Sequence, residues 1–135
     1  MSAPTAPTAW YHGRAHRAGE TAQVLVTDHP EPGAGTVLRA VIHIPRHSPT
    51  GMAWGYLGSG AADLALSVLV DAVWQGQPPC PCVLENRSID GACLDCGTPR
   101  LPYQEFKEQF VATWPEDGAW ALPAAELRAW LTEPR

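Results

Sequence analysis

Four cysteines, all within residues 79–97, are the side chains of this sequence with the clearest chemical meaning. The stretch reads "PCPCVLENRSIDGACLDCG" and supplies Cys80, Cys82, Cys93 and Cys96. Structural zinc sites are four-coordinate and tetrahedral, and four thiolates satisfy that preference. Cysteines three positions apart, followed by Gly97, are typical of a zinc knuckle. We therefore predict one structural Zn²⁺, held by all four cysteines in a loop at 79–100.

Other uses of these cysteines remain open from the sequence. Two disulfides would need an oxidising compartment, and the N-terminus lacks the basic-then-apolar pattern of a signal peptide. Free or redox-active thiols and an iron–sulfur cluster are further alternatives. A catalytic zinc needs an open coordination position, which four cysteine ligands do not leave. We expect a cytoplasmic protein in which the metal keeps a poorly apolar loop folded.

A glycine-rich turn, "WGYLGSG" at residues 54–60, is the second candidate site. It precedes an apolar stretch at 61–75 that predicts a helix, and the N–H groups at a helix N-terminus can hold an anion. The dinucleotide fingerprint is not met, because Asp63 stands where the last glycine belongs. Two interpretations stay open. The turn is a tight connection with Ser59 capping the helix, or it forms a ligand or anion site from Trp54, Tyr56, Gly58, Ser59 and Gly60.

No catalytic motif accompanies these two sites. Neither Gly-x-Ser-x-Gly nor His-Glu-x-x-His occurs in the chain, and a pairing of Ser59 with a histidine is a weaker alternative. Nine Lys and Arg against 14 Asp and Glu give a net charge of -5, which disfavours nucleic-acid binding. No apolar run is long enough to span a membrane. We expect a non-enzymatic module that binds another macromolecule, namely a protein. The alternative is a small-ligand or enzymatic domain that uses the Trp54–Gly60 turn.

The elements that must position these residues follow an α+β order. Apolar and alternating patterns at 23–28 and 36–44 predict an antiparallel hairpin, to which residues 8–12 could add a strand. In the predicted helix at 61–75, the polar residues recur every four positions, as Asp63, Ser67 and Asp71, so most of its circumference is expected to be buried.

Beyond the cysteines, residues 103–114 and 123–131 predict two further helices, with a short strand between them at 119–122. We therefore expect a small N-terminal antiparallel sheet packed on a central buried helix and two further helices, with the zinc loop inserted. Residues 1–10 read as a flexible leader, and 11–135 as one domain.

Three segments carry a family resemblance: "MAWGYLGSGAADLALSVLVDA", "YQEFKEQFV" and "WALPAAELRAWL". They resemble an uncharacterised domain family of bacteria, archaea and their phages, whose members share a Trp-Gly-Tyr-x-Gly-Ser-Gly turn entering an apolar helix. The resemblance spans Tyr11 to Leu131, with Met52 in place of an aromatic residue and Ala61 in place of proline. The cysteine loop looks like an insertion between two family helices. The resemblance implies the α+β fold and an association with phages or plasmids, and assigns no activity.

Overall fold

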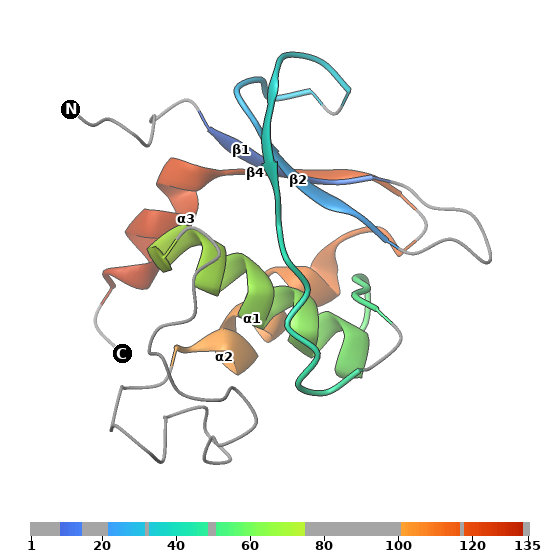
Figure 1. Ribbon diagram of the computed structural model, residues 1–135. Coiled ribbons are helices and arrows are strands. Elements are labelled where there is room, and N and C mark those ends of the chain that lie inside the picture. The colour runs from blue at the N-terminus through green and yellow to red at the C-terminus, as the bar shows by residue number, and fades with distance from the viewer. Residues whose placement is uncertain are drawn as a thin grey trace.

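The fold is built around a long apolar helix that lies against one face of a four-stranded antiparallel sheet (Figure 1). A computed structural model of the chain describes residues 9–14, 22–31, 33–48, 51–74, 101–116 and 118–133. The predicted zinc loop at 79–100, with all four cysteines, and most of the predicted leader lie outside the described residues. In the described part the fold class α+β is confirmed.

The sheet contains β1 (Trp10–Gly13), β2 (Val24–Thr27), β3 (Val37–Ala40) and β4 (Trp120–Pro123), in the order β3-β2-β1-β4. The predicted hairpin of β2 and β3 is confirmed. The additional N-terminal strand is present as β1, in the middle of the sheet. The short C-terminal strand pairs with β1, with Gly13 opposite Trp120. One face of the sheet is apolar and buried because alternate side chains point to it, as Val24 and Val26 do.

The helices are α1 (Ser59–Trp74), α2 (Tyr103–Gln109) and α3 (Ala124–Leu131), with a 3₁₀ turn, η1 (Val111–Thr113), after α2. The helix predicted at 61–75 is therefore confirmed, and it begins two residues earlier. The helix predicted at 103–114 is divided, because Phe110 leaves helical geometry with φ -122° and the chain then tightens into η1. Helix α3 begins directly after Pro123.

The elements form layers, with α1 between the sheet and α2 (Figure 1). Helix α1 is buried on several sides by residues such as Leu64, Val68 and Leu69, which join one core cluster with the inner face of the sheet. On the α2 side, Phe106 stacks on Phe110 at a ring-centroid distance of 4.9 Å. The central position predicted for this helix is thus confirmed.

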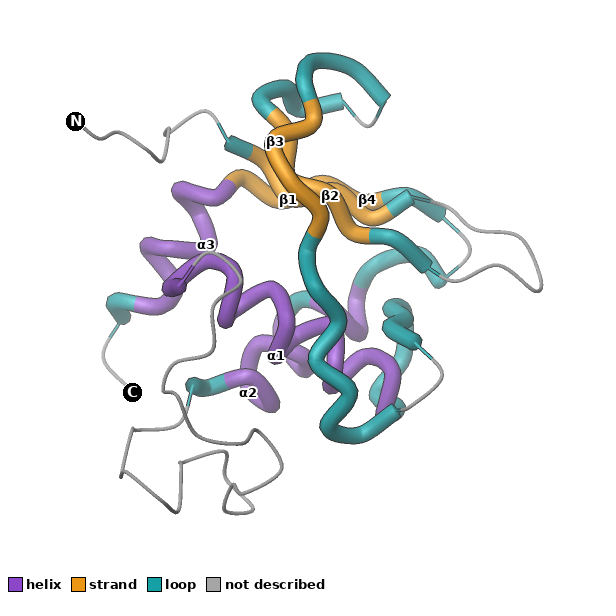
Figure 2. Tube along the Cα trace, viewed as in Figure 1, coloured by secondary structure: helices purple, strands orange, loops and turns teal. Residues whose placement is uncertain are grey.

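Two boundaries differ from the sequence-based expectation. The strand predicted at 36–44 pairs with β2 as a strand only over Val37–Ala40, after which the chain stays extended and crosses α1 (Figure 2). At the N-terminus, β1 starts at Trp10, and the backbone oxygen of the buried Ala9 accepts the N–H of Ala124 at 2.9 Å. Residues 9 and 10, which were assigned to the leader, therefore take part in the described fold.

Candidate functional site

The polar stripe of α1 is buried and faces the extended segment 39–48. Asp63, Ser67 and Asp71 are all almost inaccessible to solvent. Each accepts hydrogen bonds from the segment that runs from β3 across the helix (Figure 2). Because a buried carboxylate or hydroxyl must be paired to be tolerated, these contacts explain why three polar residues occur in an otherwise apolar helix.

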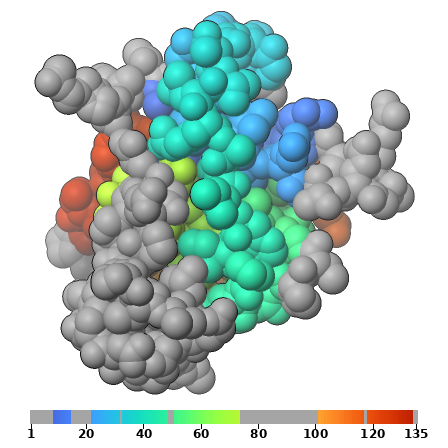
Figure 3. Space-filling view, viewed as in Figure 1, coloured from blue at the N-terminus to red at the C-terminus, as the bar shows by residue number. Residues whose placement is uncertain are grey.

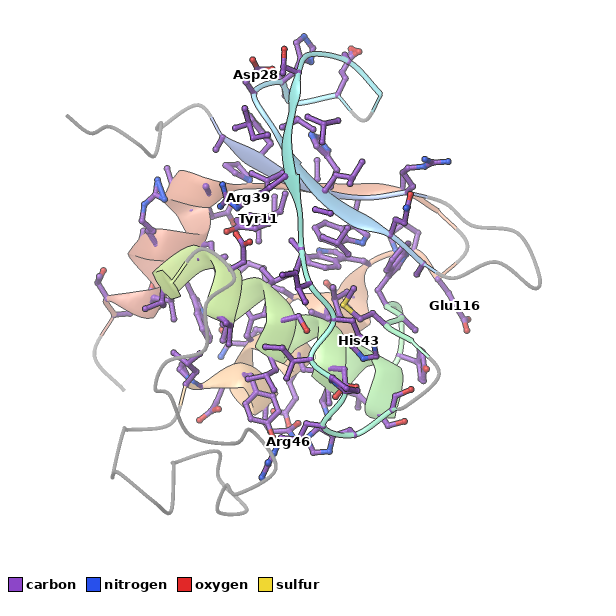
Figure 4. All side chains as sticks on the ribbon, viewed as in Figure 1. Tyr11, Asp28, Arg39, His43, Arg46 and Glu116 are labelled. Atoms are coloured by element: carbon purple, nitrogen blue, oxygen red, sulfur yellow. The ribbon has the colours of Figure 1, made fainter. Side chains whose placement is uncertain are left out.

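At the C-terminal end of the stripe, Asp71 binds Arg39 and Tyr11. The Arg39 guanidinium donates to Asp71 Oδ1 at 2.6 Å and, through Nε, to Oδ2 at 3.0 Å. Tyr11 Oη donates to Asp71 Oδ1 at 2.8 Å, and Figure 4 shows Tyr11 and Arg39 converging between the sheet and α1. Burial, and then the adjacent Asp71, raise the pKa of Tyr11 well above its ordinary value. The hydrogen bond to Asp71 raises the pKa of Arg39.

At the N-terminal end, Asp63 binds two backbone amides and one imidazole. Its Oδ1 accepts the N–H of His47 at 2.8 Å, and its Oδ2 accepts the N–H of Ser48 at 2.9 Å and His43 Nε2 at 2.8 Å. Between the two carboxylates, Ser67 Oγ accepts the N–H of Ile44 at 2.9 Å. The stripe therefore fixes segment 39–48 at three points along α1.

We call the contacts of Asp63, Ser67 and Asp71 with segment 39–48 the anchor, because they attach this segment to α1. A carboxylate that orients a histidine also occurs in catalytic triads, but Asp63 directs its remaining acceptor capacity to backbone amides of the segment itself. His47 Nε2 lies 2.8 Å from the hydroxyl of Tyr103 on α2, which ties the segment to a second helix. Among the described residues, no group of three or more His, Cys, Asp or Glu side chains is arranged to hold a metal.

The anchor exposes the other side of the same segment. Since side chains alternate along an extended chain, the inward positions of Arg39, Val41 and His43 turn Leu38, Ala40 and Ile42 outward. We call these three residues the outer row. Leu38 is 48% exposed and Ile42 is 63% exposed. Figure 3 shows residues 33–48 as a continuous cyan and blue-green band down the viewed face.

Part of the backbone of the outer row also points away from the sheet. Strand β3 is an edge strand in the order β3-β2-β1-β4. The N–H of Val41 donates to the backbone oxygen of Val24 at 2.9 Å. In an antiparallel pair such bonding alternates from residue to residue, so the amides and carbonyls of Ala40 and Ile42 face away from β2. The register shifts between Val26 and Thr27, so that Leu38 is the extra residue of the ladder and the alternation restarts at Val37. The outer row thus combines an available strand edge with exposed apolar side chains.

The residues of the predicted ligand or anion site at the glycine turn do not converge on one point. Trp54 is a core residue, whose Nε1 donates to the backbone oxygen of Gly118 at 2.9 Å. Tyr56 is exposed, and its ring covers Gly58, where an added Cβ would lie 2.1 Å from the ring. Ser59, also exposed, is the first residue of α1, and the buried Gly60 packs against Ala53. Anion binding at this turn stays a prediction.

The stretch from β1 to the end of α1, which contains the anchor and the outer row, matches a family model over residues 11–77. The family matched is DUF6166, a family of unknown function. The predicted resemblance to an uncharacterised domain family is thereby confirmed over residues 11–77. The DUF6166 match ends before the first cysteine, and the taxonomic range and the signature of the turn remain predictions. Comparison with curated proteins and with solved structures finds no match.

The DUF6166 segment supplies three of the four strands and the central helix, whereas β4, α2 and α3 lie outside it. Both ends of every anchor contact on α1 fall within the segment, since Tyr11, Arg39 and Asp71 are all part of it. In the described part of the chain, no helix combines the length and the apolar character needed to cross a membrane.

Proposed function

We propose that this protein is an interaction module that binds an extended segment of another protein along the free edge of β3. The observation that supports this function is the outer row, in which an edge strand presents apolar side chains to solvent. A peptide that adds a strand there gains main-chain hydrogen bonds from the edge and apolar contacts from Leu38 and Ile42.

The charge distribution along β3 favours this function over a simple solvent-facing edge. Natural edge strands are commonly protected by charged side chains, lysine above all. Within residues 37–42 the sequence is "VLRAVI", and its one charged residue is Arg39. Arg39 is turned inward and paired with Asp71 at 2.6 Å, so the anchor removes the charge from the edge. The partner we expect is a segment with alternating apolar residues, since alternate side chains of an added strand face the sheet surface.

Selection from a displayed library of random peptides tests this proposal with the full chain. We expect enrichment of alternating apolar sequences, with binding that is lost in Leu38→Lys and Ile42→Lys. Leu57→Lys is the matched control, because Leu57 is 62% exposed but lies outside β3 and the outer row. Equal weakening by all three variants, or no enrichment above background, would contradict strand addition at β3.

We also propose that Cys80, Cys82, Cys93 and Cys96 hold one structural zinc in a reducing, cytoplasmic environment. The support for this site is the spacing of the four thiolates and their fit to a closed tetrahedral site. Native mass spectrometry of the chain, purified without added metal, tests it. One zinc per chain, released on denaturation with four free thiols, is the expected result. A metal-free mass lowered by about two hydrogens per disulfide bridge would overturn both the zinc and the compartment.

A further inference from the structure

The outer face of the sheet carries a cavity of about 460 Å³. Its floor is made by outward-facing residues of three strands, since Tyr11, Val24 and Val26 point to the core and their neighbours point away from it. The lining includes His12, Arg14, Leu25 and Val37, together with Gly35 in the connection between β2 and β3. This volume falls within the range of small-molecule sites.

The β2–β3 connection forms one wall of this cavity. Gly35 has a φ of +74°, and an added Cβ there would lie 2.4 Å from Asp28 Oδ1, so the wall requires glycine. The Asp28 carboxylate accepts the backbone N–H of Thr36 at 2.7 Å. Asp28 is therefore engaged in shaping the connection, which lies at the top of Figure 4.

His12 is a buried polar side chain of the lining, with 2% of its surface exposed. Its Nε2 lies 2.7 Å from the backbone oxygen of His29. A carbonyl oxygen only accepts hydrogen bonds, so Nε2 carries the proton. In the neutral ring Nδ1 is then an acceptor, and it is buried without a hydrogen-bond partner among the described residues. Leaving a buried polar atom unpaired costs free energy, and a bound hydrogen-bond donor would remove that cost.

Arg14 gives the cavity its charge. Among the described lining residues it is the one with a permanent charge, and none of them is a carboxylate. Its guanidinium is exposed and makes a long hydrogen bond of 3.4 Å to Gln23. Among the described residues Gln23 is its one hydrogen-bond partner, and the planar fork of the guanidinium matches a carboxylate. The remaining lining is mainly apolar, with Leu25 and Val37 on neighbouring strands.

We propose that this cavity binds a small, mainly apolar organic acid that also carries a hydroxyl or N–H donor. The carboxylate pairs with Arg14, the apolar body lies on Leu25 and Val37, and the donor meets Nδ1 of His12. Nδ1 is buried, so this contact requires the imidazole to turn toward the cavity that His12 lines. This site is distinct from the outer row, because Leu38, Ala40 and Ile42 are not among the described lining residues.

The test uses 4-hydroxyphenylacetate and two probes that each differ from it in one group. Phenylacetate lacks the hydroxyl, and 4-hydroxyphenylacetamide has an amide in place of the carboxylate. Backbone amide shifts of the full chain are followed by NMR during titration. We expect saturable shifts at the lining residues, with 4-hydroxyphenylacetate binding about fivefold tighter than either of the others. Arg14→Gln should abolish the preference for the acid over the amide. His12→Phe should abolish the preference for the phenol over the unsubstituted ring.

Lys107→Gln on α2 is the matched loss of a positive charge away from the sheet, and it should leave all three affinities unchanged. Equal weakening by Arg14→Gln and Lys107→Gln would overturn the proposal, since it would show attraction by overall charge alone. Shifts that do not saturate, or that lie outside the lining, would overturn it too. If His12→Phe fails to fold, the probe series and the exposed Arg14 still decide the outcome.

Discussion

The two faces of the sheet differ in how their polar groups are satisfied. On the inner face, Asp63, Ser67 and Asp71 are buried and bonded to the segment that crosses them. On the outer face, Nδ1 of His12 lies beside a cavity and is buried without a hydrogen-bond partner among the described residues. Leu38 and Ile42 are exposed. The contrast teaches that the carboxylates and the hydroxyl of α1 stabilise the fold. The features available to a ligand or partner are on the other face of the sheet, where apolar residues predominate.

The largest effect that would test this contrast is expected for Asp71→Ala. The substitution leaves Arg39 and the buried Tyr11 without their shared acceptor. The ion pair is partly buried, with the Arg39 side chain 33% exposed and that of Asp71 2% exposed. Losing its hydrogen bonds together with the one from Tyr11 is expected to cost about 3 kcal/mol of unfolding free energy, and urea denaturation measures it. In the double variant Arg39→Ala/Asp71→Ala the two costs should not add. A loss below about 1 kcal/mol for Asp71→Ala, the range of exposed pairs, would show that the inner cluster is not an anchor.

A somewhat smaller loss, about 2 kcal/mol, is expected for Asp63→Asn, because hydrogen bonds to charged groups contribute about 1.5–3 kcal/mol. The side chain keeps its size, but its amide nitrogen must face a backbone N–H of His47 or Ser48. Hydrogen exchange of those two amides, with Ile44 as the internal reference bonded to Ser67, locates the effect. Unchanged protection of His47 and Ser48 would contradict the three-point attachment.

The pH dependence of stability in Tyr11→Phe tests whether the Tyr11 hydroxyl is buried in the contact with Asp71. The pKa of Tyr11 is raised in the folded state, so its contribution to stability is complete below the unfolded value of about 10. That contribution is lost as the pH rises from there towards the folded pKa, at about 1.4 kcal/mol per pH unit. The stability advantage of the wild type over Tyr11→Phe should therefore shrink by about that amount between pH 10 and pH 11. A difference that is constant with pH would place the Tyr11 hydroxyl in contact with solvent.

The smallest effect is expected on the outer face. Leu38→Lys and Ile42→Lys should change the unfolding free energy by less than about 0.5 kcal/mol, as exposed substitutions usually do. Both side chains are about half exposed or more. Thermal melts of the two variants alongside the wild type measure this. A loss of several kcal/mol would mean that the outer row is part of the core, and the binding role would lose its basis.

The fold was largely predictable because most elements leave a periodic signal. The apolar run of α1 and the alternation around β2 gave their positions to within two residues. The partner of β4 was not predictable, because "WALP" carries no information about pairing with residues 10–13. The division of the second helix at Phe110 was missed for a similar reason, since its residues keep a helical pattern through Trp114.

The site was predictable only in part. The spacing of Asp63, Ser67 and Asp71 was visible, but their partners in segment 39–48 depend on how the chain returns across the helix. The outer row was one of two alternating rows between residues 37 and 44, and both contain apolar residues. The residue that decides between them is Arg39, which reaches Asp71, the last carboxylate of the predicted polar stripe, only if its row faces inward. The role of His12 could not be predicted, because the sequence does not show which ring nitrogen of a histidine in a strand has a hydrogen-bond partner.

The position of β1 between β2 and β4 has a consequence for biosynthesis. The strand made first among the described elements is completed on one side by the neighbouring β2, but on the other side only by residues 120–123. Such a long-range pairing forms late and slowly, because the chain must close a large loop before the contact is gained. During translation, β1, β2 and α1 emerge with one edge of the sheet still uncovered. A nascent chain halted before Trp120 would expose a hydrophobic strand edge to chaperones, and release from them would coincide with synthesis of the final strand and helix.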